Sequence, residues 1–219
     1  MATVASGRHS FDLQDLEASR RYDLLVGLVV PRPIGLVSTV SEDGVPNLAP
    51  FSFFMVGGIN PPSLMFCPLI KKNGDEKDSL QNVRANGEFV VNLVDFAMAK
   101  GINEAGISFD SDFDEWQVSG FSPEESTVVK PARVKESAAQ FECRLHQIVH
   151  HGDGPSAAVY VIGEALIAHV ADELVDQSAK LLRRFEPIAR LGGPDYLNLA
   201  DGNFFEMPRP KGPSESSAE

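Results

Sequence analysis

The sequence predicts a mainly β fold, antiparallel and closed into a barrel, with helices only at its margin. Short apolar runs rich in β-branched residues recur along the chain and are separated by turn-forming sequences. Two long β-rich segments, residues 133–150 and 157–171, are joined by a turn that contains glycine and proline. Strand and helix alternate only once, which favours a barrel over a doubly wound parallel sheet.

The individual elements follow from local patterns. At the N-terminal end, apolar residues at helical spacing predict one or two short amphipathic helices that end before Pro31. The turn sequence Glu-Asp-Gly at 42–44 joins the first two strands into a hairpin. The predicted strands are 34–41, 45–56, 63–67, 88–94, 133–150 and 157–171. The predicted helices are 12–28, 78–86 and 175–185.

Composition limits the classes of function. The chain has 219 residues, 43% of them hydrophobic, which suffices for one compact domain, expected over 1–207 and followed by a disordered tail at 208–219. The net charge of −12 argues against nucleic acid, so small molecules are the expected partners. Cys67 and Cys143 have no partners at zinc spacing, so neither a disulfide nor a metal site is expected. The apolar run 24–30 is too short to span a membrane, and a cytoplasmic location is expected.

The tripeptide Lys77-Asp78-Ser79, at the start of a predicted short helix, is suited to bind an anion. Asp78 or Ser79 can cap the helix, the N–H groups of its first turn can meet a phosphate, and Lys77 adds a positive charge. The alternative is an ordinary N-cap beside a solvated lysine, which is the more frequent situation for an isolated tripeptide.

The segment 47–54 places a small residue, a proline and a hydroxyl in a strand that is otherwise apolar. A flat ring system can approach the backbone at Ala49 and Pro50, and Asn47 and Ser52 can hydrogen-bond its polar edge. The alternative is a barrel strand whose phenylalanines fill space on both faces, and the pattern supports the two equally.

Other polar residues have a structural interpretation beside a functional one. The histidines at 150–151 flank a turn and have no third ligand at metal spacing. His169 lies in an apolar run, as core and interface histidines do. Arg190, with two glycines and Tyr196 after it, predicts either a loop near a ligand or the end of a helix. The acidic run 110–115 lacks the glycine and final glutamate of a calcium loop and is interpreted as a solvated connection.

Taken in order, segments along most of the chain resemble the flavin reductase-like, FMN-binding split-barrel family, which includes flavoredoxin. Residues 31–39 resemble its opening strand, residues 47–54 its flavin-contacting strand, and residues 77–79 its phosphate loop. The other similar segments are 61–62, 88–93, 114–116, 120–121, 131–134, 163–164, 169–170, 190–193 and Tyr196.

The resemblance implies a six-stranded antiparallel split β-barrel that forms a homodimer and binds FMN in a groove between the subunits. It implies an oxidoreductase that uses NADH or NADPH to reduce flavin or another small acceptor, and it is compatible with a partner oxygenase. The alternatives are a non-catalytic flavin-binding electron carrier and a split-barrel protein that binds another ligand. No catalytic acid or base is expected, because the cofactor carries the hydride chemistry.

The resemblance also implies site residues, which are Asn47, Ala49, Pro50, Phe51 and Ser52 along the ring and ribityl chain, Lys77, Asp78 and Ser79 at the phosphate, and Asn92 as a further contact. The chain departs from the family pattern at two places. Many relatives have an arginine where this chain has residues 67–72, and an asparagine where it has Met55. Lys71 or Lys72 could supply the missing charge, though without the two-pronged geometry of a guanidinium, and the sequence leaves open whether either does.

Overall fold

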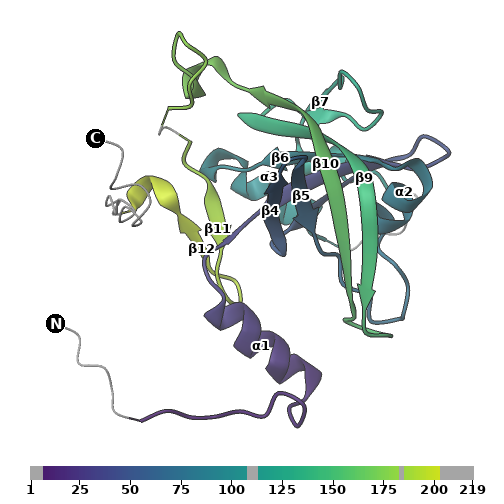
Figure 1. Cartoon of the computed structure of the whole chain (residues 1–219), viewed down its shortest axis with the longest axis vertical. Coiled ribbons are helices and arrows are strands. Elements are labelled where there is room, and N and C mark those ends of the chain that lie inside the picture. The colour runs from purple at the N-terminus through teal and green to yellow at the C-terminus, as the bar shows by residue number, and fades with distance from the viewer. Residues whose placement is uncertain (1–6, 108–112, 183–184, 203–219) are drawn as a thin grey trace, which may run out of the picture.

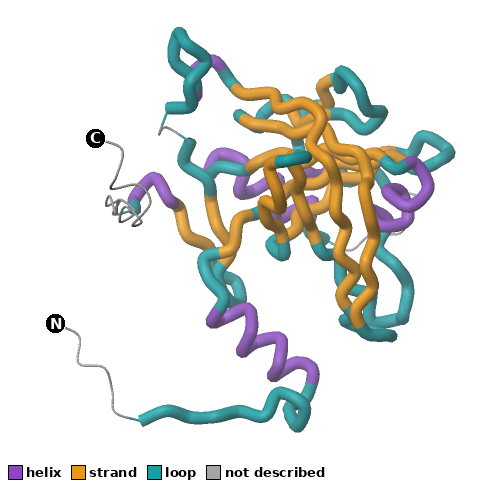
Figure 2. The backbone as a smooth tube through the Cα atoms, in the orientation of Figure 1, coloured by secondary structure: helices purple, strands orange, loops and turns teal. Residues whose placement is uncertain are grey.

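The computed structural model describes residues 7–107, 113–182 and 185–202 of the chain. Its main sheet has seven antiparallel strands in the order β3-β2-β6-β9-β10-β5-β4. These strands are β2 (Gly35–Val40), β3 (Pro46–Phe51), β4 (Phe54–Ile59), β5 (Pro62–Phe66), β6 (Glu88–Leu93), β9 (Ala139–His151) and β10 (Ala158–Val170). Figure 1 shows the strands curling around one another with the helices outside them, and Figure 2 shows the same arrangement by element type. The predicted mainly β, antiparallel fold with marginal helices is confirmed.

The barrel closes through its two edge strands, which are consecutive in the sequence. β3 and β4 lie at opposite ends of the strand order, yet only Ser52 and Phe53 separate them. Two residues can join both edges of a sheet only if the sheet curls until the edges meet. The strand predicted over 45–56 is therefore bent, and it pairs with β2 before the bend and with β5 after it. Counted as one strand, it gives the six strands of the expected split barrel.

Two apolar cores support the barrel. The interior is centred on three phenylalanines, with ring centroids 4.9 Å apart for Phe51 and Phe66 and 5.3 Å apart for Phe66 and Phe89. The second core lies outside the sheet, where Leu48 and Trp116 pack with residues of two short helices, α3 (Ala99–Ala105) and α4 (Trp116–Ser119). Because α3 and α4 cover the outer side of β3, they fix the position of that strand beside the helix α2 (Asp78–Asn86).

An arm extends from one end of the barrel (Figure 1) and is made of α1 (Ala18–Leu28), β1 (Arg32–Pro33), β11 (Ile188–Arg190) and β12 (Tyr196–Asn198). The buried guanidinium of Arg32 holds it together by donating to the carbonyls of Val26 at 2.6 Å, Val29 at 2.7 Å and Leu191 at 2.8 Å. Val26 is the one buried residue of α1, so most of the apolar side chains of this helix are exposed.

The remaining elements are short, namely η1 (Phe96–Met98), β7 (Pro123–Glu124), β8 (Arg133–Val134), η2 (Asp172–Leu174) and η3 (Leu199–Asp201). None of the helices in the described part of the chain is long and apolar enough to cross a bilayer. The tail predicted at 208–219 lies outside the described residues.

Two helix predictions need correction. The first helix covers only Ala18–Leu28 of the predicted 12–28. The helix predicted at 175–185 is wrong over its described residues, where a turn with a bridge between Val175 and Leu181 replaces it. The carboxylate of Asp176 accepts from the N–H groups of Ser178 and Lys180, and Ala179 adopts a left-handed φ of 57°. These local hydrogen bonds compete with helix formation. Residues 183–184 lie outside the described part.

Candidate functional site

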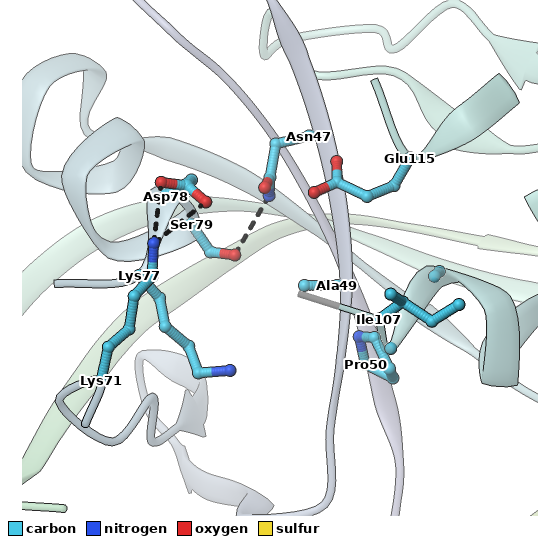
Figure 3. A pocket seen from close by; sticks show the side chains of 11 residues that line it. Asn47, Ala49, Pro50, Lys71, Lys77, Asp78, Ser79, Ile107 and Glu115 are labelled. Carbon is cyan, nitrogen blue, oxygen red and sulfur yellow. Dashed lines mark hydrogen bonds and ion pairs between the residues drawn. The ribbon is translucent and has the colours of Figure 1, made fainter. Parts of the chain in front are cut away.

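A small polar pocket of about 70 Å³ lies where the first turn of α2 faces β3 (Figure 3). It draws on β3, the segment leading into α2, the first turn of α2, the end of α3 with the two residues after it, and the residue before α4. Its lining consists of Asn47, Ala49, Pro50, Lys71, Lys77, Asp78, Ser79, Ala105, Gly106, Ile107 and Glu115. Six of the nine predicted site residues therefore meet at one pocket.

The N-terminus of α2 has an uncapped first turn. Lys77 is the N-cap residue and makes no side-chain capping bond, contrary to the expectation that Asp78 or Ser79 would cap the helix. The Asp78 carboxylate instead accepts from Nζ of Lys71 at 3.3 Å. Among the described residues, no acceptor meets the backbone N–H groups of Asp78 and Ser79. Both groups, together with the helix dipole, are available to an anion.

Lys77 places a cation in the pocket. Its side chain is half-buried, and Figure 3 shows the ammonium directed toward β3. Nζ lies 5.8 Å from the ring centroid of Phe51, and no carboxylate within the described ranges forms an ion pair with it. Burial lowers the pKa of Lys77, the charge of Lys71 lowers it further, and Asp78 partly offsets both. A bound anion would relieve this cost.

A chain of buried side chains fixes the hydroxyl of Ser79. Asn82 Nδ2 donates to Thr39 Oγ1 at 3.1 Å, and Asn47 Nδ2 donates both to Thr39 Oγ1 and to Ser79 Oγ at 3.0 Å each. Because Ser79 Oγ already accepts, its hydroxyl hydrogen is free to be donated into the pocket. Thr39 and Asn82 were not among the residues predicted from the sequence. A signal existed, since Asn82 lies three residues after Ser79 on the same face of α2.

Glu115 is a third site residue that was not predicted, because it was assigned to a solvated acidic connection. Its side chain is 6% exposed, and Oε2 accepts from the backbone N–H of Leu48 in β3 at 3.2 Å. Burial raises the pKa of Glu115, while hydrogen bonds from its own backbone and from Leu48 partly offset the rise. The solvated interpretation is therefore wrong for Glu115, and Asp110 and Asp112 lie outside the described residues.

The other predicted site residues lie elsewhere. Phe51 is buried in the barrel core, with its ring beneath the Lys77 ammonium. Ser52 follows at the bend and lines a different cavity. Asn92 is fully buried, where Nδ2 donates to the carbonyl of Leu36 at 2.9 Å and Oδ1 accepts from the N–H of Val134 at 2.8 Å. Its amide is thus used in joining barrel segments, and it does not line the pocket.

The second cavity is large and mainly apolar, with a volume of about 830 Å³. It lies between α1, the bend after β3, β5 and the turn that joins β9 to β10. Among its lining residues are Tyr22, Ser52, Phe53, Met65 and Cys67. Burial raises the pKa of the Cys67 thiol, with a partial offset from a backbone hydrogen bond with Val159, which keeps the thiol neutral. The volume of this second cavity is in the range of about 300–1,000 Å³ that small-molecule sites occupy.

Two further predicted features have structural partners. His169 Nε2 lies 2.7 Å from Oε1 of the fully buried Glu142, whose carboxylate also accepts from three backbone N–H groups at residues 127–129. Arg190 stacks on the ring of Tyr196 and donates to its hydroxyl and to the carbonyl of Gly193. Gly192 and Gly193 lie in the turn of the β11–β12 hairpin, so the interpretation of this segment as the end of a helix is wrong.

The histidines at 150–151 lie at the end of β9, and Arg84 approaches Nε2 of His150 at 3.3 Å. Within the described residues, no three side chains of ligand type are grouped closely enough to hold a metal ion.

The comparison with known families now decides the assignment. The family described as "Flavin reductase like domain" matches residues 27–189. The chain belongs to this family. The match covers the barrel and the small pocket but only a minor part of the arm, since most of α1 and all of β12 lie outside it. The resemblance inferred from the sequence is confirmed, and the chain is placed among flavin-related oxidoreductases.

Individual relatives support the assignment. A protein of Aquifex aeolicus is 39% identical over 189 residues, which are 85% of this chain and 94% of that protein. The structure of nitrilotriacetate monooxygenase component B from Bacillus cereus has a TM-score of 0.86 at 31% identity and covers 93% of this chain and 100% of its own. The 2-nitrobenzoate 2-nitroreductase of Pseudomonas fluorescens has a TM-score of 0.80 at 30% identity, with coverage of 91% and 96%. Flavoredoxin of Desulfovibrio vulgaris, at 20% identity and a TM-score of 0.69 over 82% and 92%, shows the shared fold.

Proposed function

We propose that this protein binds FMN and acts as an oxidoreductase that uses NADH or NADPH to reduce flavin or another small acceptor. One observation carries the proposal. In a chain of the flavin reductase-like family, the Lys77 ammonium, the hydroxyl of Ser79 and the N–H groups of Asp78 and Ser79 converge on one pocket beside β3, and within the described ranges neither the ammonium nor these N–H groups have an acidic or carbonyl partner. Such a set of donors at a helix N-terminus is suited to a phosphate group.

The shape of the pocket fits one part of FMN. A volume of about 70 Å³ accommodates a phosphate group but not a tricyclic ring. We therefore place the phosphate between Lys77 and Ser79, with Lys71 as the second cation in place of the family's arginine and Asp78 as the group that holds Lys71. Lys72 is exposed and does not line the pocket.

We place the ribityl chain and ring along β3, past Asn47, Ala49 and Pro50 toward the bend, where Ser52 opens onto the large cavity. Pro50 has no N–H and Ala49 has a small side chain, so a ring can lie close to the backbone there. Phe51 acts from beneath, through its contact with Lys77. Asn92 is left out of this site because its amide is already used.

When bound, FMN supplies the hydride-accepting and electron-transferring chemistry. The residues of the chain hold the phosphate, orient the ring and present a mainly apolar cavity to the second substrate. The large cavity is the space we assign to the nicotinamide or to the acceptor, because it adjoins the bend at Ser52. We assign no acid or base.

We also propose a homodimer that acts in the cytoplasm. The apolar side chains of α1 and β4 support an interface, since Leu28 is 73% and Ile59 is 88% exposed. β4 is an edge strand of the main sheet, and an exposed apolar edge favours association. The two free, buried cysteines are compatible with a reducing compartment. The similarity to a monooxygenase component B supports a partner oxygenase that receives reduced flavin.

Spectroscopy of the purified protein tests the proposal. After incubation with FMN and removal of free flavin, the protein is expected to retain flavin absorption and to bleach when NADH or NADPH is added without oxygen. Retained FMN that neither nicotinamide reduces would indicate the electron carrier instead. A protein that retains no FMN would refute both flavin functions.

A further inference from the structure

The pocket has a second half that consists of hydrogen-bond acceptors. Both hydrogens of the Asn47 amide nitrogen are used by Thr39 and Ser79, so this amide offers Oδ1 to the pocket. Glu115 uses Oε2 for Leu48, and Oε1 accepts no hydrogen bond from another described residue. Figure 3 shows the Glu115 carboxylate directed toward Asn47, across from the two lysines. One side of the pocket therefore donates and the other accepts.

A carboxylate is the wrong group for a site that binds only phosphate. Like charges repel most strongly in a buried, low-dielectric place, and the side chain of Glu115 is only 6% exposed. Burial raises the pKa of Glu115, which shows that its charge lacks full solvation in the free protein. An acceptor held in such a place is stabilised by a ligand that brings its own donors, and hydroxyl groups do this without adding charge.

We infer that Glu115, together with Oδ1 of Asn47, accepts hydrogen bonds from hydroxyl groups of a polyol chain attached to the phosphate, and so selects a polyol phosphate over a bare anion. This inference rests on the proposed FMN function, where the polyol is the ribityl chain. Thr39 and Asn82 are positioning residues, because their hydrogen bonds direct the Asn47 amide so that Ser79 donates and Asn47 Oδ1 accepts.

Three flavins separate the two halves of the pocket. FMN has the phosphate and the ribityl hydroxyls, riboflavin has only the hydroxyls, and lumiflavin has neither. The ratio of FMN to riboflavin affinity thus reports the phosphate, and the ratio of riboflavin to lumiflavin affinity reports the hydroxyls. Both ratios are measured by fluorescence titration on the full chain at one pH and ionic strength.

The decisive variant is Glu115→Gln, because a glutamine oxygen can still accept from Leu48 while the charge is lost. The riboflavin-to-lumiflavin ratio is expected to fall about fivefold, the effect of losing roughly one hydrogen bond. The FMN-to-riboflavin ratio is expected to rise, because a negative charge beside the phosphate is removed. These two shifts in opposite directions are not expected from a residue that only supports β3.

Glu104→Gln is the matched control, since Glu104 in α3 precedes the pocket residue Ala105 and does not line the pocket itself. It is expected to leave both ratios unchanged. A ligand-side test needs no variant, since on wild-type protein at least one riboflavin that lacks a single ribityl hydroxyl is expected to bind about fivefold more weakly than riboflavin.

Equal changes for riboflavin and lumiflavin in Glu115→Gln, or deoxy analogues that all bind like riboflavin, would overturn the role of Glu115 and leave FMN binding intact. If the wild-type protein binds none of the three flavins, the proposed function fails, and this inference fails with it.

Discussion

Replacing Lys77 with alanine is expected to weaken FMN binding about 30-fold. The ammonium is half-buried and has no ion pair among the described residues, so its interaction with the phosphate should contribute more binding free energy than an exposed ion pair does. A hydrogen bond to a charged group contributes about 1.5–3 kcal/mol, and a mid-range value of about 2 kcal/mol is roughly a 30-fold change in Kd. Stability is expected to change by less than about 0.5 kcal/mol, because Lys77 forms no ion pair within the described ranges and its contact with the Phe51 ring is a long one, at 5.8 Å.

The assay is a titration of apoprotein with FMN and with riboflavin, followed by flavin fluorescence. Lys77→Ala should lose affinity for FMN and retain its affinity for riboflavin, which has no phosphate. Lys72→Ala removes the same charge from an exposed neighbouring position that does not line the pocket, and it should change neither affinity more than about twofold. FMN binding in Lys77→Ala at the wild-type level, or an equal loss for both flavins, would refute the placement of the phosphate.

Three other predictions concern positioning, stability and packing. Asn82→Ala should weaken the binding of FMN about fivefold and that of riboflavin as well, with little effect on lumiflavin, since a freed Thr39 no longer holds the Asn47 amide that orients both Ser79 and Asn47 Oδ1. Equal losses for FMN and lumiflavin in isothermal titration calorimetry would contradict this. The pKa of Glu142 is lowered, because hydrogen bonds from backbone N–H groups and His169 outweigh the opposing effect of burial. The folded-state pKa of Glu142 is below the unfolded-state pKa, so the charged carboxylate stabilises the fold above the unfolded pKa, and this stabilisation is lost as pH falls through the folded value. In urea unfolding at several pH values, the free energy of unfolding of Glu142→Gln should therefore differ from that of wild type by an amount that shrinks in acid. Gly163→Ala should destabilise the protein by about 1–3 kcal/mol, because a Cβ there would lie 2.3 Å from Cζ of the buried Phe89. Gly27→Ala is the control, since open space surrounds that position, and it should not destabilise the protein. Similar melting temperatures for the two variants would contradict this account of the packing.

The strands were predictable because alternation and turn chemistry are local signals. The bend at Ser52 and Phe53 was not predictable, since it arises when the sheet curls and brings its two edge strands, β3 and β4, together. The false helix at 175–185 had suitable apolar spacing, but side-chain hydrogen bonds from Asp176 gave the backbone a different partner. Periodicity describes which face a residue would occupy and does not report such competition.

The site was predictable in part. Lys77 and Ser79 are adjacent to a helix start, and the mixed composition of 47–54 distinguished that strand. Glu115 was missed because its acidic neighbours suggested solvent, whereas its burial depends on α4 packing over β3. Thr39 was missed because a hydroxyl residue in a strand gives no sign of a partner 43 residues away, such as Asn82.

The small pocket joins parts of the chain that are distant in sequence, from Asn47 in β3 to Glu115 before α4. A ligand held there can bind only when these segments are assembled, so by mass action its binding energy adds to the free energy of unfolding, by about 2.7 kcal/mol when free ligand is at 100 times Kd. Cells short of flavin would then hold a less durable apoprotein, and cofactor supply would set how long each molecule survives proteolysis.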